Sequence, residues 1–432
     1  MKQVENGRIR KRTVPLLKEE HERIRKRTVP LLAGVMYMVS IGVLYIWSVV
    51  RRVIELEWGW TATQSGLPFS VGIVCFATGN LIGGRLQLKL PARLVGTIGG
   101  FLTGAGFVLC GFAGDAPLMV ALFFGGVTGL GVGLGYSSYL PTVLRWYAPD
   151  RKGFVSGWII GGFGVTPLYL APLASFLIDR YGIQVMFMSI GVMTMVISMV
   201  LAQFIKVPEQ RSVEPVSVMA EQGSEAVEKP RVDMTSRQMM ATKEFYILFL
   251  MFLCSVSIGQ MVIGNVTGIV ALQAGVTDAA VLAMLVSFVA LANVGGRITG
   301  GVLSDRIGRM NTLLLVFIIQ LINMVGFGFY GNMPMLVTGI MLAGFCFGMT
   351  LGVYPAITVD RFGQRYYSSN YGIMYMAFGC AGIAAPLIAG YFFDKNGNYD
   401  IVYFICAIGM AVMVGFSLLL KFMRRFQTRE DS

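Results

Sequence analysis

Charged residues are scarce in this sequence of 432 residues, and histidine is almost absent. Lys, Arg, Asp and Glu together make up 13% of the chain, and His21 is its single histidine. A soluble domain carries about 25% charged residues, so this composition excludes a soluble fold. Hydrophobic residues reach 55% instead, which indicates a protein that resides in a lipid bilayer.

The residue sets that enzymes and metal sites need are also missing. The sequence has no paired carboxylates, no nucleophile with a neighbouring base and no glycine loop followed by Lys-Ser/Thr that holds a nucleotide. Its six cysteines form no CxxC pair and fall in apolar stretches, which is typical of buried thiols. We therefore expect neither an enzyme nor an ATP-driven pump, and neither a metal nor a cofactor.

Apolar stretches long enough to cross a membrane recur along the whole chain. About 20 apolar residues span the ~30 Å of hydrocarbon in a bilayer. Twelve such stretches predict an all-α integral membrane protein with twelve transmembrane helices in two six-helix bundles. They lie at residues 31–52, 62–84, 94–113, 117–140, 154–177, 183–205, 245–271, 279–302, 311–330, 333–356, 369–392 and 398–422.

A polar segment divides the twelve stretches into two sets of six. It is rich in Glu, Ser and Val and poor in aromatic residues, which predicts a partly disordered linker. A six-plus-six plan is typical of transporters whose binding site lies between two bundles near the membrane midplane. The predicted parts are a basic tail at 1–29, an N-terminal bundle at 30–205, a linker at 206–243, a C-terminal bundle at 244–424 and a tail at 425–432.

The distribution of Lys and Arg predicts how the chain is oriented. These residues concentrate in both tails and in the connections that follow 62–84, 117–140, 183–205, 279–302 and 333–356. Because cytoplasmic loops carry an excess of basic residues, both termini are expected in the cytoplasm of a multi-pass cell-membrane protein.

The formal net charge of +12 comes largely from the N-terminal tail and the predicted cytoplasmic loops. Attraction to anionic lipid headgroups explains a polybasic tail, so we expect the lipid bilayer as a partner and no nucleic acid. The tail sequence at 8–17 recurs identically at 23–32. This repeat indicates a local duplication or a misplaced start codon.

One charge interrupts the apolar stretch 281–302. Arg297 is the only ionisable residue there, and a charge at this depth costs from about 3 to more than 10 kcal/mol. The sequence supplies almost no fixed carboxylate at a matching depth. A guanidinium presents paired planar donors that fit a carboxylate, so the partner of Arg297 is expected to be the transported molecule.

A loop motif follows this stretch. Residues 300–309 read GGVLSDRIGR, and they resemble the G-x-L-x-D-R-x-G-R motif of the major facilitator superfamily. The resemblance implies a gating role for Asp305, Arg306 and Arg309, with the aspartate pairing across the cytoplasmic interface in one state. The matching segment in the first half is degraded and has Leu88 in place of the acid.

Further segments narrow the resemblance within that superfamily. GVLYIWS at 42–48, GVGLGY at 131–136, RWYAPDRKG at 145–153 and NYGIMYMAFG at 370–379, together with Asn293 and Arg297, resemble the oxalate:formate antiporter family and the monocarboxylate transporters. The similarity implies alternating access, with Arg297 binding the carboxylate of a small organic anion. Asn293 lies one helical turn earlier, where it can contact the same carboxylate or hold the guanidinium.

Two replacements relative to these families bear on the substrate. Asn293 stands where animal-type monocarboxylate transporters have an aspartate, and Phe378 stands where the oxalate antiporter has a lysine. A single cation at this depth favours a monoanion, because a dianion keeps an uncompensated charge in a low-dielectric medium. A proton can then travel on the substrate or through tyrosines, or the cycle is anion exchange.

Weaker candidates complete the predicted pocket. Their alternative role is ordinary packing between helices, which is as common for buried tyrosines and apolar side chains. They are Tyr45, Tyr136 and Tyr375, which bring hydroxyl groups to the membrane interior, and Leu44, Phe347 and Leu351, which align with pocket walls of the family.

The sequence thus predicts a monomeric secondary transporter of small monocarboxylates of the lactate, pyruvate and formate class. Protons are expected either as a co-transported partner or not at all, depending on whether the cycle is symport or exchange. One alternative keeps the fold and moves oxalate or a bulkier organic anion. A different class of function, a transporter-like membrane sensor, also fits the composition.

Overall fold

The structure, a computed structural model, describes residues 28–206, 233–276 and 278–430. Every regular element in these ranges is a helix. The first span, Thr28–Glu57, is broken by the 3-10 turn η1. The elements of the N-terminal half are η1 (Gly42–Ile46), α2 (Trp47–Glu57), α3 (Ala62–Leu86), α4 (Ala92–Cys110), α5 (Pro117–Val120), the π-helical η2 (Ala121–Thr128), α6 (Gly129–Leu144), η3 (Pro149–Arg151), α7 (Lys152–Tyr181) and α8 (Ile183–Ala202).

The second half begins with a short helix before its first span. Its elements are α9 (Ser236–Met240), α10 (Lys243–Gly264), α11 (Val266–Ala274), α12 (Ala279–Ile307), α13 (Arg309–Phe327), α14 (Met333–Phe362), α15 (Tyr367–Asn396) and α16 (Asp400–Glu430). The last helix continues through most of the segment predicted as a C-terminal tail at 425–432. Residues 1–27 of the predicted basic tail and 207–232 of the predicted linker lie outside the described residues.

Twelve of the described helices are long and apolar enough to cross a membrane, one for each predicted stretch. This confirms the predicted number of spans. The predicted stretch 245–271 covers two helices, because the chain breaks at Asn265 between α10 and α11. Several other helices extend past their apolar stretch; α14, for example, runs six residues beyond the predicted end at 356, to Phe362.

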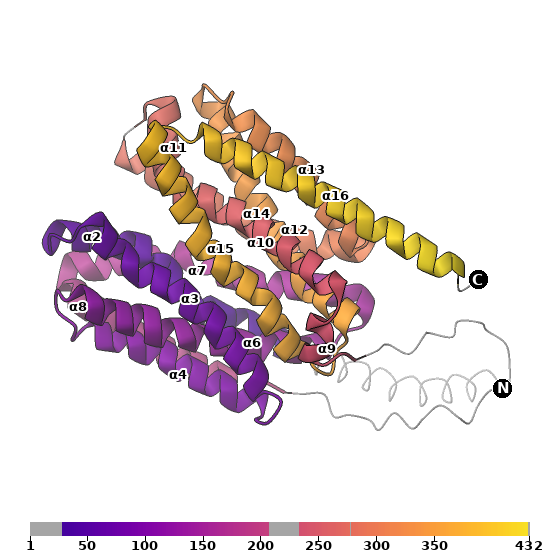
Figure 1. Cartoon of the computed structure of the whole chain (residues 1–432). Helices are drawn as coiled ribbons and strands as arrows, with labels where there is room; N and C mark the ends of the chain where they lie inside the picture. The colour runs from indigo at the N-terminus through magenta and orange to yellow at the C-terminus, as the bar shows by residue number, and fades with distance from the viewer. Residues whose placement is uncertain (1–27, 207–232, 277, 431–432) are drawn as a thin grey trace, which may run out of the picture.

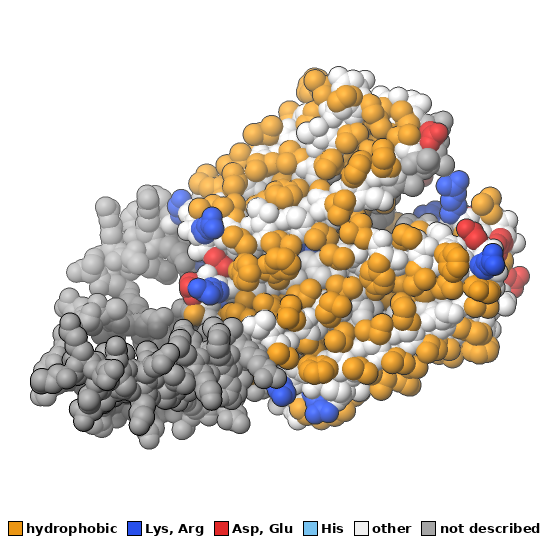
Figure 2. Space-filling model, turned by 180° about the vertical axis from the view of Figure 1, so that it is seen from behind, with side chains coloured by type: hydrophobic (Ala, Val, Ile, Leu, Met, Phe, Trp, Pro, Cys, Tyr) orange, Lys and Arg blue, Asp and Glu red, His pale blue; other side chains and the backbone are white. Residues whose placement is uncertain are grey.

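The two halves lie side by side (Figure 1). α3 packs along α15, and α7 packs along α12 and α14. We call the end where α8 finishes and α10 starts the linker end. The halves meet closely there, whereas at the opposite end the surface is hollowed between them (Figure 2). Hydrophobic side chains cover the flanks in the same view, as a bilayer requires.

The described end of the linker is attached to the C-terminal half. The Asp233 carboxylate accepts hydrogen bonds from the backbone N–H groups of Gln364 (2.8 Å) and Arg365 (3.1 Å). The Asn370 side chain donates to the Met234 carbonyl oxygen at 2.9 Å. The predicted linker at 206–243 therefore includes a segment that packs against the connection between α14 and α15.

The contact between α7 and α12 at the linker end depends on glycine. A Cβ atom at Gly301 would fall on the carbonyl oxygen of Gly153, and one at Gly153 would fall on the carbonyl oxygen of Gly301. The backbones of the two halves therefore touch directly, as small residues permit in membrane helices. Next to this contact, the Ser156 hydroxyl donates to the Gly352 carbonyl oxygen of the other half at 2.8 Å.

Replacing Gly301 should separate the halves at the linker end. Overpacking costs about 1–3 kcal/mol, so we expect Gly301→Ala to raise the open population roughly 5- to 150-fold. The measurement is the maleimide labelling rate of Ser156→Cys, a buried position, with the native cysteines replaced. Gly415→Ala is the control, because its surroundings in α16 are open. Equal labelling rates with and without Gly301→Ala would contradict the proposed role of this contact.

Candidate functional site

Arg297 lies on α12 where that helix faces α7, and its side chain is buried, with 1% of its surface exposed. Its guanidinium donates three hydrogen bonds. Nε donates to Asn293 Oδ1 at 2.7 Å, Nη1 to the Ile160 carbonyl oxygen at 2.7 Å, and Nη2 to the Tyr45 hydroxyl at 3.3 Å. The first acceptor belongs to α12 itself, and the other two belong to the N-terminal half.

All three acceptors are neutral. Among the described residues, no carboxylate pairs with Arg297. The protein therefore orients the guanidinium with dipoles and leaves its charge uncompensated. A guanidinium has five N–H donors, so one donor on Nη1 and one on Nη2 remain without a described protein acceptor. These are the paired donors that bind both oxygens of a carboxylate.

Aromatic rings from both halves pack next to this charge. Tyr45 contacts Phe163 of α7 with ring centroids 5.4 Å apart, and Phe163 stacks on Phe76 of α3 at 5.6 Å. Phe76 in turn contacts Tyr136 of α6 at 5.4 Å and Tyr375 of α15 at 5.3 Å. The structure thus brings the three predicted tyrosines into one cluster with Phe76 and Phe163, which no sequence motif indicates.

Two further predicted residues extend this cluster into the C-terminal half. Phe378 stacks on Tyr375 with centroids 4.9 Å apart, and Phe347 of α14 stacks on Phe378 at 6.3 Å. The remaining two candidates are buried apolar residues. Leu44 contacts Gly72 of α3, and Leu351 lies on α14. Their assignment to the pocket wall stays a prediction.

The motif at 300–309 connects the two halves. The structure places Asp305 and Arg306 in the last turn of α12 and Arg309 at the start of α13, so the predicted loop is largely helical. The Asp305 carboxylate accepts hydrogen bonds from the backbone N–H groups of Gly153 (2.9 Å) and Phe154 (2.6 Å) at the start of α7, and it also pairs with Arg309. Arg309 forms a second ion pair with Asp360 at 2.9 Å. The side chain of Arg306 is exposed. Asp305 and Arg309 therefore occupy positions suited to a gate, and Arg306 lies at its surface.

A profile of the Major Facilitator Superfamily matches residues 31–386 and 319–431 of this chain. The chain belongs to the major facilitator superfamily. Membership confirms the predicted fold class and the expectation of a membrane transporter that is not an enzyme.

Known proteins align with most of the transporter. The oxalate:formate antiporter of Oxalobacter formigenes is 28% identical over 376 residues, which cover 86% of each chain. Monocarboxylate transporter 12 of Mus musculus is 27% identical over 399 residues, covering 86% of this chain and 80% of its own. These similarities confirm the predicted family resemblance. Among solved structures, the Escherichia coli fucose:proton symporter FucP in its outward conformation shares the fold, with a TM-score of 0.69, 16% identity, and coverage of 91% of this chain and 98% of its own.

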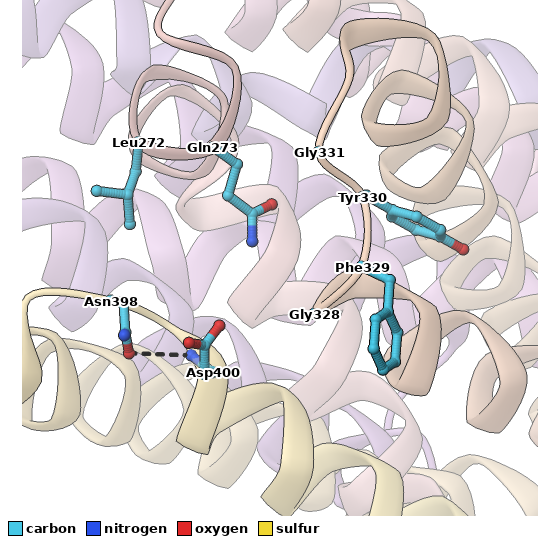
Figure 3. Close-up of a pocket in the computed structure, with 8 residues that line it drawn as sticks. All are labelled: Leu272, Gln273, Gly328, Phe329, Tyr330, Gly331, Asn398 and Asp400. Carbon is cyan, nitrogen blue, oxygen red and sulfur yellow. Dashed lines mark hydrogen bonds between the residues drawn. The ribbon is translucent and has the colours of Figure 1, made fainter.

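A separate, open surface pocket of about 310 Å³ lies in the C-terminal half of the transporter, and Arg297 is not among its lining residues (Figure 3). Residues of α11, the connection after α13 and the start of α16 line it, among them Gln273, Tyr330 and Asp400. Its lining contains an acid and no basic residue, so this pocket does not fit an anion.

Removing the charge of Asp305 should weaken the closure of the linker end. An Asp305→Asn substitution keeps the size of the side chain and loses the charge-assisted bonds to the start of α7 and to Arg309. Such bonds contribute about 1.5–3 kcal/mol. We therefore expect roughly 10- to 150-fold faster hydrogen exchange at the Gly153 and Phe154 amides, measured by mass spectrometry. Asp179→Asn, at an exposed position of α7, is the matched control, and unchanged exchange in Asp305→Asn would rule out the gate assignment.

Proposed function

We propose that this protein is a secondary active transporter of small monocarboxylate anions, such as lactate, pyruvate or formate, and that Arg297 binds the carboxylate. The two bundles, 30–205 and 244–424, alternate between access from either side. The acceptors of Arg297 belong to the same chain as the arginine, and the proposal includes a transporter that acts as a monomer. The linker end, which carries most of the basic loops, faces the cytoplasm together with both termini.

The uncompensated charge of Arg297 is the observation that carries this proposal. Retaining a buried charge without a counter-ion is costly, and an anionic substrate removes that cost when it binds. The one free donor on each terminal nitrogen matches the two oxygens of a carboxylate. The names of the aligned relatives, an oxalate:formate antiporter and a monocarboxylate transporter, point to the same class of substrate.

The number of buried cations supports a monoanion. Among the described residues, Arg297, Lys152 and Arg361 have buried basic side chains. At the linker end, Lys152 binds Gln364 and Arg361 pairs with Glu244. Beside Arg297 the walls are aromatic, and Phe378 supplies no second charge. A dianion such as oxalate would therefore keep one charge uncompensated in this site. Preference for oxalate or for a bulkier anion remains the alternative that a competition assay distinguishes.

The decisive experiment replaces Arg297 in reconstituted vesicles. We expect Arg297→Gln to lower labelled lactate counterflow at least ~30-fold, because losing one partner of a buried charge interaction costs about 2–5 kcal/mol. Arg297→Lys should also lose uptake, since an ammonium cannot hold Asn293, Ile160 and Tyr45 in the same planar geometry. Arg180→Gln, at an exposed position of α7, is the control.

Competition by formate, pyruvate, oxalate and a bile acid in the same vesicles identifies the substrate class. Monocarboxylates should compete at lower concentrations than oxalate. Lactate counterflow at the wild-type rate in Arg297→Gln would disprove the site. If none of the anions moves through the wild-type protein, the transport proposal itself fails and the sensor alternative gains support.

An acid at position 293 should compete with the substrate. In Asn293→Asp the introduced carboxylate replaces an acceptor that lies 2.7 Å from Arg297 Nε and neutralises the guanidinium internally. We expect lactate to bind at least ~10-fold more weakly, the equivalent of losing about 1.4 kcal/mol. Equilibrium binding measures the effect, with the exposed Asn396→Asp as control. Unchanged affinity would show that the charge of Arg297 does not attract the substrate.

A further inference from the structure

We propose that a chain of buried hydroxyl groups on α6 and α15 conducts protons between the linker end and the carboxylate at Arg297. The transporter is then a proton-coupled symporter. The chain consists of Tyr367, Tyr371 and Tyr136, with the amide of Asn80 beside it. This inference rests on the proposed function, because it supplies the proton route for the same substrate site.

The four side chains share an unusual property. Tyr136, Tyr367 and Tyr371 are each 1% exposed and Asn80 is 0% exposed, yet none of their hydroxyl or amide atoms has a hydrogen-bond partner in the described protein. A buried polar group without a partner costs about 1–3 kcal/mol. Such groups in proteins are normally bonded to another residue or to ordered water.

Other buried tyrosines of this chain do find partners. The Tyr37 hydroxyl donates to the Gly96 carbonyl oxygen at 2.7 Å, and the Tyr354 hydroxyl donates to the Leu248 carbonyl oxygen at 2.9 Å. Tyr139 likewise bonds to the Leu201 carbonyl oxygen. Burial alone therefore does not leave a tyrosine hydroxyl without a partner. Among the described buried tyrosines, the unpartnered hydroxyl groups are the three of the series and that of Tyr403 on α16.

Together with Tyr375, the unpartnered tyrosines form a continuous series of neighbouring rings. Tyr367, Tyr371 and Tyr375 recur every four residues on α15, so they lie on one face of the helix. Their neighbouring ring centroids are 5.5 and 5.6 Å apart, and Tyr136 of the opposite half lies 5.2 Å from Tyr375. The series begins at the first residue of α15, at the linker end, and ends in the aromatic cluster next to Arg297.

Asn80 lies between the helices that carry these tyrosines. A Cβ atom at Gly133 of α6 would meet the Asn80 backbone N, and one at Gly372 of α15 would meet the Asn80 backbone O. Gly133 is three residues from Tyr136, and Gly372 adjoins Tyr371. The Asn80 backbone thus lies against the segments of α6 and α15 that carry Tyr136 and Tyr371, and its unpartnered side-chain amide is contributed by α3.

Hydroxyl groups suit proton conduction because each can accept one proton while it donates another. When a proton reaches the Tyr367 oxygen, the original hydroxyl proton leaves for the next oxygen, directly or through ordered water. Every phenol returns to its neutral form. At the end of the series the carboxylate of the substrate takes the proton, an O–H bond forms, and the substrate becomes a neutral acid that Arg297 holds less strongly.

The electrostatic surroundings are consistent with this route. The charged and titratable groups that act on Tyr136, Tyr371 and Tyr375 are Arg297, Tyr45 and the tyrosines themselves. Tyr367 is influenced by Tyr136. No carboxylate is among these neighbours within the described chain, so no fixed acid traps the proton before it reaches the substrate.

The test separates proton-driven uptake from exchange in vesicles, with lactate as the probe. Counterflow at equal pH requires no net proton movement, whereas uptake driven by an imposed pH gradient does. We expect Tyr371→Phe and Tyr367→Phe to keep counterflow, because both rings remain. Their gradient-driven uptake should fall ~100-fold, the lower limit of what a positioned proton-transfer group contributes. Asn80→Leu provides a third variant with a similar volume and no polar atoms.

Tyr403→Phe is the matched control. Its hydroxyl is also buried and unpartnered, but it lies on α16 against Phe327, with centroids 5.0 Å apart, outside the series. Full gradient-driven uptake in both tyrosine variants would overturn the proton route. The route would also be overturned if the wild-type protein performs counterflow but an imposed pH gradient does not accelerate its uptake of lactate. Absence of wild-type counterflow with every carboxylate would instead overturn the proposed function.

Discussion

The guanidinium of Arg297 needs acceptors from both halves, and this need constrains the whole transporter. The bond from its Nε to Asn293 lies within α12, so it does not depend on the relative position of the two halves. Its bonds to Ile160 and Tyr45 cross between the halves and must break or adjust when the bundles separate. Under the proposed function, a bound carboxylate adds two charged acceptors at the donors that Nη1 and Nη2 keep free. The proposed substrate and the relative position of the halves would then be linked through a single side chain.

The surrounding structure reinforces this dependence by placing the site among apolar side chains. Aromatic rings from α3, α6, α7, α14 and α15 pack around the charge, and apolar walls strengthen electrostatic interactions inside. The direct backbone contact between Gly153 and Gly301 closes the linker side at the same time. At the opposite side, the surface is hollowed between the halves (Figure 2).

The sequence predicts the spans and the central charge well, for physical reasons. Hydrophobic length is a local property, so each of the twelve stretches coincides with a helix. Arg297 stands out because an isolated charge in an apolar stretch is conspicuous, and Asn293 follows from helical spacing. The motif around Asp305 predicts a gate without revealing which groups the carboxylate binds.

What the sequence does not reveal is set by contacts between distant segments. The carbonyl oxygen of Ile160 has no residue-type signature, since every residue carries one. Phe76 and Phe163 look like ordinary membrane-helix residues until α3 and α7 are placed beside α15 and α12. Likewise, an unpartnered hydroxyl such as that of Tyr371 is visible only when its surroundings are known. The extension of α16 over the predicted tail arises because a polar sequence can continue a helix beyond the bilayer.

The two edges of the linker end are held with different strength. On the α7–α12 edge a carboxylate, Asp305, fixes the start of a helix. On the α3–α15 edge the equivalent position is Leu88, which is exposed, and a neutral contact of 3.4 Å from the Ser368 hydroxyl to the Gln87 side chain takes its place. Separation should therefore begin at the neutral edge and pivot about the charged one. The transporter would open as an asymmetric hinge, although each half consists of six membrane-spanning helices.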